Sequence, residues 1–179
     1  MDDHTSIVKN QLNSEHINSK VNKMSDTFIF WTHGADVIVE YTKEYTGHDN
    51  GLYLRRAGWG AQVKQKKGSL NWFHFAIPSA SKLDGDNVSH CHAWLRAKVN
   101  NDAVIDRVHV RVAAGPQRNN LLIFDSGSLN ITEQDDQFSF DLPNQRCKGP
   151  LVMCVRVKFE GNKGEVVFAG AGGWFEEWT

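Results

Sequence analysis

Histidines, tryptophans and arginines recur at every second position in several strand-like stretches of this sequence. In NWFHFAIPSA, residues 71–80, Trp72 and His74 alternate with Phe73 and Phe75. Side chains of a strand point alternately to opposite faces, so the phenylalanines are expected in the core and Trp72 and His74 on the outer face. An outward indole beside an imidazole is suited to contact a flat, polar ligand.

Two later stretches show the same alternation. VSHCHAWLRAKV, residues 88–99, would bury Cys91 and alternate apolar residues, and RVHVRV, residues 107–112, would bury its valines. If these strands share a sheet, its outer face carries a band with almost no acid. We call the predicted ligand-binding residues of this band the outward band: Trp72, His74, His90, His92, Trp94, Arg107 and His109.

The outward band predicts a surface that binds a small polar molecule, either carbohydrate-like or anionic. Aromatic side chains flanked by hydrogen-bond donors suit sugar rings, and arginines suit carboxylate, sulfate or phosphate groups. The alternative is a solvated sheet face, where outward residues are polar only because water covers them. Exposed tryptophans and histidines favour the binding surface over the solvated face.

A metal site ligated by histidines, as in a metal-dependent enzyme, is a further alternative for the same residues. His90 and His92, separated by one residue, would point the same way on a regular strand, and His109 or His74 could supply a third nitrogen. The stretch lacks a downstream glutamate ligand, and the neighbouring arginines would repel a divalent cation. The sequence therefore favours no cofactor, with a divalent transition metal as the alternative.

Catalysis without a cofactor is also open, with His74 and His109 as the candidate catalytic residues. Either imidazole could transfer a proton in an isomerase or cyclase of specialised metabolism. No acid is evident in the band to orient such a histidine, which favours a binding module over an enzyme. The glycine-rich AGAGG, residues 169–173, follows a strand with too few residues left for a dinucleotide-binding unit, and is expected to bend the backbone.

The overall composition sets bounds on the class of protein. The chain has 179 residues, three cysteines and a net charge of −1. This predicts no nucleic-acid partner and buried free thiols in place of a disulfide framework. MDDHTS at the start is unlike a signal peptide, and no apolar run is long enough to span a membrane, so a cytoplasmic protein is expected. The oligomeric state stays open.

The arrangement of short apolar runs predicts an all-β fold. Residues 1–26 are polar, without aromatic residues or glycine, and are expected to form a disordered or marginally helical tail. Residues 27–179 contain about eleven strand-like runs separated by turns rich in glycine, asparagine and aspartate. They predict one domain with an antiparallel β-sandwich or jelly-roll fold.

Five strings resemble the signature of a family of small bacterial and fungal proteins of unknown function. They are WTHG (31–34), RRAGWG (55–60), NWFHFAIPSA (71–80), RVHV (107–110) and AGAG (169–172). The resemblance spans most of residues 28–173 and implies a compact β-rich domain. It implies no activity, ligand or cofactor.

Overall fold

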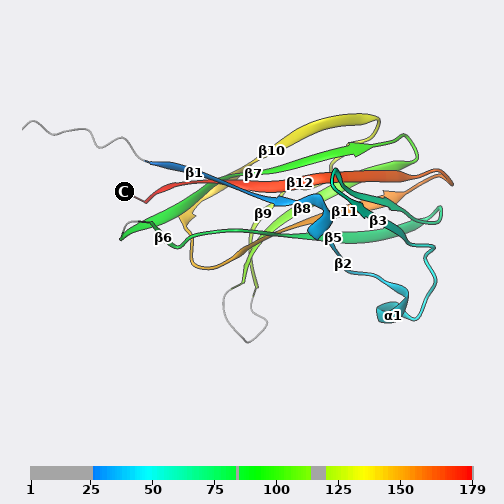
Figure 1. The fold of residues 1–179 in the computed structure, drawn as a ribbon, viewed down its shortest axis with the longest axis horizontal. Coiled ribbons are helices and arrows are strands. Elements are labelled where there is room, and N and C mark those ends of the chain that lie inside the picture. Colours follow the sequence, from blue (N-terminus) through cyan, green and yellow to red (C-terminus); the bar gives the residue numbers. More distant parts are fainter. Residues whose placement is uncertain (1–25, 84, 114–119, 179) are drawn as a thin grey trace, which may run out of the picture.

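Strands predominate in the computed structural model, which describes residues 26–83, 85–113 and 120–178 (Figure 1). The predicted tail, residues 1–26, lies outside the described residues except for Asp26. The strands form two antiparallel sheets that pack face to face around a hydrophobic core. The predicted all-β sandwich is therefore confirmed.

One sheet has seven strands and the other five. The seven-stranded sheet consists of β1 (Thr27–His33), β3 (Tyr53–Ala57), β4 (Gly60–Lys64), β6 (Lys82–Leu83), β7 (Asp86–Val99), β10 (Gln134–Arg146) and β12 (Glu165–Glu177). The five-stranded sheet consists of β2 (Ile38–Val39), β5 (Ser69–Ile77), β8 (Ala103–Ala113), β9 (Asn120–Asp125) and β11 (Leu151–Phe159). A 3-10 turn, η1 (Gly34–Asp36), and one short helix, α1 (Lys43–Thr46), connect the early strands.

The strand pairing is that of a jelly roll. Antiparallel pairs form between β4 and β12, β5 and β11, β7 and β10, and β8 and β9. Each pair joins an earlier strand to a later one. Along the sequence, each pair encloses the next, so that β8 and β9 are the innermost pair. This nested pairing distributes eight strands over two sheets as a jelly roll does, which confirms that part of the prediction.

The core between the sheets consists of the apolar sets that the alternation predicts. Phe73 and Phe75 of β5 are fully buried, and their rings lie 5.2 and 5.3 Å from that of Phe168 on β12. These contacts join the two sheets directly. Since truncating such a ring removes both burial and packing, this cluster contributes strongly to stability.

Strand β7 departs from regular alternation at Cys91. Trp174 of β12 pairs with His92, but the next residue, Phe175, pairs with His90, so Cys91 is an extra residue in a β-bulge. For the residues of β7 that precede Cys91, the side chains expected on the outer face therefore point to the core, and those expected in the core point outward. His90 is 1% exposed and Cys91 is half-buried, opposite to the predicted faces of both residues. Cys147 and Cys154 are buried thiols, as predicted.

The glycine-rich segment is a further difference from the prediction. AGAGG does not bend the chain away from the sheet, because β12 continues through it to Glu177. Its glycines lie beside side chains of β1 (Thr27–His33): a Cβ on Gly172 would lie 2.8 Å from the Trp31 ring.

In the described part of the chain, no helix is long and apolar enough to cross a membrane.

Candidate functional site

The outer face of the five-stranded sheet brings together part of the outward band. Across β5, β11 and β8, His74 pairs with Cys154, which pairs in turn with His109. Two residues further along, Trp72 of β5 pairs with Arg156 of β11. Side chains at these positions all face away from the core, so Trp72, His74, Arg107 and His109 share one face as predicted.

A cavity of about 500 Å³ opens on this face, and we call it the Trp72 pocket. Outward residues of β11 form its floor, while β5 and the end of β2 border one side and β8 the other. Its main lining residues are Glu40, Trp72, His74, His109, Arg111, Val152 and Cys154.

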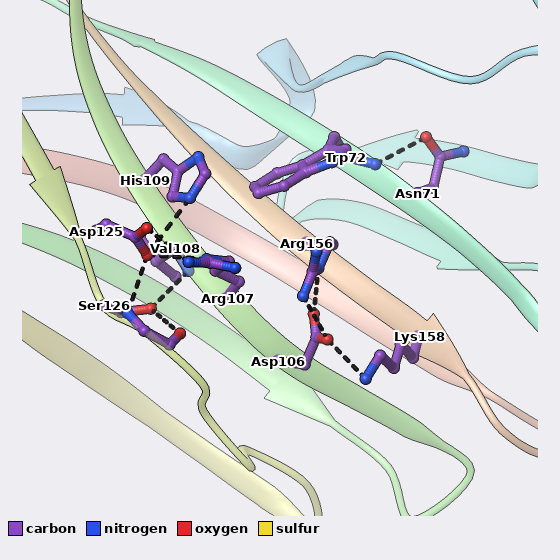
Figure 2. Close-up of polar contacts among 11 residues, drawn as sticks. Asn71, Trp72, Asp106, Arg107, Val108, His109, Asp125, Ser126, Arg156 and Lys158 are labelled. Carbon is purple, nitrogen blue, oxygen red and sulfur yellow. Dashed lines mark hydrogen bonds and ion pairs between the residues drawn. The ribbon is translucent and has the colours of Figure 1, made fainter. Parts of the chain in front are cut away.

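Two aromatic rings form the end wall of the Trp72 pocket. The Trp72 indole reaches across β11, and its centroid lies 4.8 Å from that of His109, with the planes tilted by 37° (Figure 2). The guanidinium of Arg156 lies 5.4 Å from the Trp72 centroid. This cation–π contact and the contact with His109 hold the indole in place.

An acid–arginine network lies beyond this wall. Arg107 makes two hydrogen bonds with Asp125, at 2.8 and 2.7 Å, and Arg156 makes two with Asp106, at 2.8 and 2.9 Å (Figure 2). Lys158 Nζ lies 2.8 Å from Asp106. The prediction of a face with almost no acid is therefore wrong, because the acids lie on irregular positions that alternation does not assign to the outer face. Arg107 is held by Asp125 and does not line the pocket.

The network also sets the charge of its members. Hydrogen bonds from Arg107 hold the pKa of Asp125 well below its ordinary value. Burial alone would raise the pKa of Asp106, but hydrogen bonds from Arg156 and Lys158 lower it overall. Both carboxylates are therefore ionised at neutral pH and balance the nearby cations.

His109 is neutral at pH 7. Burial lowers its pKa, and Arg111, Arg107 and Arg156 lower it further against the opposing charge of Asp125. Its Nε2 lies 3.4 Å from Asp125 Oδ1, but makes no hydrogen bond to any described residue. The ring therefore contributes to the pocket mainly as a flat surface beside Trp72.

His74 has an acidic partner that the sequence did not reveal. Its Nε2 donates a hydrogen bond of 2.8 Å to Glu40 Oε2, and the Glu40 backbone is fixed by a hydrogen bond from its N–H to Trp72 O. The prediction that no acid orients a histidine of the band is wrong. The carboxylate fixes the tautomer of His74 with the proton on Nε2.

The thiol of Cys154 lies in the floor between the two histidines. Burial raises its pKa to about 11, outweighing the attraction of Arg111. It is therefore a protonated thiol at neutral pH and not a nucleophile.

His90 does not belong to the binding surface. The bulge at Cys91 turns it inward, where Nδ1 donates a hydrogen bond of 2.8 Å to Gln145 O and burial lowers its pKa. The pair His90 and His92 therefore points to opposite faces of β7, and His109 lies on the other sheet. The three metal candidates cannot surround one ion. No cluster of three or more metal-ligating side chains occurs among the described residues.

His92 and Trp94 lie on the outer face of the seven-stranded sheet, on the opposite side of the sandwich from the Trp72 pocket. His92 donates from Nδ1 to Asp141, at 2.9 Å, and Trp94 donates from Nε1 to Ser139, at 3.1 Å. The prediction that all seven residues of the outward band form one site is therefore wrong, because their strands belong to different sheets.

Sequence reasoning missed Glu40, Arg111, Val152 and Cys154 as pocket residues. Arg111 follows His109 at a spacing of two, and Val152 and Cys154 alternate with core residues of β11, so strand periodicity held a signal for these three. Glu40 gave none, since it follows the two-residue strand β2 and reaches His74 only through the fold.

Carbohydrate-binding modules are among the solved structures that are similar to this one. A family 29 module from Piromyces equi is 8% identical, with 82% of this chain and 90% of that chain covered and a TM-score of 0.42. A family 36 module of a multidomain xylanase from the hindgut metagenome of Trinervitermes trinervoides is 12% identical, with 83% and 96% covered and a TM-score of 0.42. A variant of a family 29 module complexed with mannohexaose is 11% identical, with 84% and 92% covered and a TM-score of 0.42.

No protein-family model and no curated protein matches this sequence. At TM-scores near 0.42, the similar structures give this chain neither a family nor a function.

Proposed function

We propose that this protein is a carbohydrate-binding module that holds a sugar in the Trp72 pocket. The observation that carries the proposal is that one cavity combines a wall of two rings, Trp72 and His109, with the hydrogen-bonded pair Glu40 and His74 and the guanidinium of Arg111. A pyranose has an apolar face and an edge of hydroxyl groups. The pocket offers a surface for each.

The charges of the pocket favour a carbohydrate over a simple anion. Glu40 faces the cavity as a hydrogen-bonded carboxylate and would repel an anionic ligand, whereas it can accept hydrogen bonds from hydroxyl groups. Arg111 lines the opposite side of the pocket, and a guanidinium can donate hydrogen bonds to hydroxyl groups. Donors and acceptors on opposite sides of the pocket suit an uncharged molecule with several hydroxyls.

A glycan array tests this proposal with three proteins. We expect the native protein and Trp59→Ala to bind the same glycans, because Trp59 lies in the β3–β4 turn and lines no part of the pocket. Trp72→Ala should bind at least one of these glycans at least about tenfold more weakly, since it loses the indole wall. The proposal is contradicted if no glycan binds, or if Trp72→Ala binds every one of them as strongly as the native protein does.

The hydrogen bond between Glu40 and His74 favours a second candidate, a cofactor-free isomerase or cyclase. With its Nε2 proton held by Glu40, His74 can accept a proton at Nδ1, as a general base does. Glycans recovered after incubation distinguish the two functions. Unchanged mass and NMR spectra would support binding alone, whereas a product formed by the native protein and not by Glu40→Gln would support catalysis.

A further inference from the structure

A row of aromatic rings crosses the outer face of the seven-stranded sheet, far from the Trp72 pocket. Trp31 of β1 and Trp94 of β7 both pair with Gly172 of β12, and their ring centroids lie 5.6 Å apart with planes 18° from parallel. The Trp94 and Trp174 centroids are 6.4 Å apart, and those of Trp174 and His92 are 4.8 Å apart. We call these four residues the tryptophan row.

The backbone of β12 makes room for the row. A Cβ on Gly172 would lie 2.8 and 2.9 Å from ring atoms of Trp31, so a side chain there would displace the indole. The core is on the other face of these strands, where Leu95, Ala171 and Phe175 are fully buried. Trp31 is 44% exposed, and the other three rings of the row are half-buried. The row therefore lies outside the core and presents aromatic surface to solvent, most of all at its Trp31 end.

Polar side chains of β10 border the row on one side. Asp135, Gln137, Ser139 and Asp141 alternate along the strand, opposite Lys98, Arg96, Trp94 and His92 of β7. The polar groups nearest the rings have partners within the sheet: Arg96 pairs with Asp135 at 3.1 Å, and His92 donates a hydrogen bond of 2.9 Å to Asp141. These contacts between side chains leave no excess of cations beside the rings, and the surface therefore suits an uncharged ligand.

A hollow of about 380 Å³ lies at the Trp31 end of the row. Trp31, His33, Arg96 and Gln137 are among its lining residues, so a ring is combined there with amide and guanidinium donors. The backbone groups of β7 and β12 are paired with neighbouring strands on both sides. An added peptide strand would therefore find no backbone partner on β7 or β12.

We propose that the tryptophan row is a second carbohydrate-binding surface, which takes an extended, uncharged oligosaccharide chain. Successive ring centroids 5.6, 6.4 and 4.8 Å apart make the row longer than one sugar ring. The rings are stacked on one another, so Trp31 at the exposed end offers a face and the rings beside it offer their outer edges to successive sugars. Gln137, Arg96 and Ser139 are placed to meet the hydroxyl groups of these sugars. The surface is independent of the Trp72 pocket, which lies on the other sheet.

Native gel electrophoresis with hydroxyethylcellulose, glucomannan or xylan in the gel tests this proposal. We expect at least one of these polysaccharides to slow the native protein, Trp59→Ala and Trp72→Ala. Trp94→Ala should lose at least about tenfold in affinity for it. Trp31→Ala is the second row variant, and should show the same loss while keeping the native thermal midpoint, because Trp31 is the more exposed ring at the end of the row.

The outcomes separate the two surfaces. Loss in both row variants with full retention in Trp72→Ala supports the row, whether or not the Trp72 pocket binds sugar. The proposal is overturned if no polysaccharide slows the native protein, or if Trp31→Ala and Trp94→Ala are slowed as strongly as it is. It is also overturned if the native protein is a dimer in solution that Trp94→Ala converts to a monomer, because a second copy would then cover the row.

Discussion

Trp72 and Phe75 lie on the same strand but have different roles, and truncating each should separate them. Phe75 is fully buried against Phe168, so Phe75→Ala should lower the free energy of unfolding by about 3–5 kcal/mol. Trp72→Ala should cost clearly less, since the indole lies on the outer face. Urea denaturation followed by far-ultraviolet circular dichroism measures both. Equal losses would mean that Trp72 is packed as a core residue.

His90 makes stability depend on pH. Burial lowers its pKa in the folded protein, so below the ordinary value of about 6.5 the unfolded chain binds a proton that the folded chain does not. The free energy of unfolding therefore falls as the pH drops from 7 to 5, by at most about 1.4 kcal/mol per pH unit for this one proton.

His90→Asn tests this linkage, because an amide can still donate to Gln145 O but cannot titrate. We expect the variant to lose less stability than the native protein between pH 7 and pH 5, in urea melts at each pH. His109, whose pKa is also lowered, stays in both proteins and serves as an internal reference. If both proteins lost the same free energy of unfolding between pH 7 and pH 5, the pKa of His90 would not be lowered by folding, and the prediction would be wrong.

Alternation correctly predicted that Trp72, His74 and His109 share one surface, because every second side chain of a regular strand lies on the same face. The same argument assigned His90 to the wrong face, since the bulge at Cys91 adds one residue and exchanges the faces beyond it. Nothing in the local sequence of β7 marks that bulge. Glu40 was missed because its contact with His74 spans two strands.

At the scale of elements, the glycines of β12 determine how β1 and β7 carry their tryptophans. Gly172→Ala should destabilise the protein by about 1–3 kcal/mol, because the new Cβ would lie 2.7 Å from Phe30 O and 2.8 Å from the Trp31 ring. Gly58→Ala is the matched control, since nothing lies within 4 Å of a Cβ there. Thermal melts compare the two. An unchanged Gly172→Ala would mean that Trp31 does not rest on β12.

Most strands could be predicted because apolar alternation and turn residues mark them locally. The apolar run LVMCVRVKF predicts a strand over residues 151–159, which are the limits of β11. The run ADVIVEY predicts a strand over residues 35–41, but only the two-residue strand β2 forms there, after the turn η1. The run EVVFA predicts a strand over residues 165–169, but β12 continues for eight more residues because flanking strands supply partners for the glycines. Those partners are distant in the sequence, so local propensity could not reveal them.

At the scale of the whole molecule, the jelly roll was predictable but the distribution of the outward band over two sheets was not. Consecutive strands such as β7 and β8 share the same alternation, yet they lie in opposite sheets. Their outward residues therefore face opposite sides of the sandwich. This separation gives the protein two candidate carbohydrate surfaces where the sequence predicted one.

The most direct test of the Trp72 pocket is the NMR signal of its indole. The chain has six tryptophans, and the signal missing from Trp72→Ala assigns the Nε1–H of Trp72. When the smallest glycan that Trp72→Ala binds more weakly on the array is added to the native protein, we predict that this signal shifts in a saturable way while that of Trp59 stays in place. A Trp72 signal that does not move at saturating sugar would contradict the account.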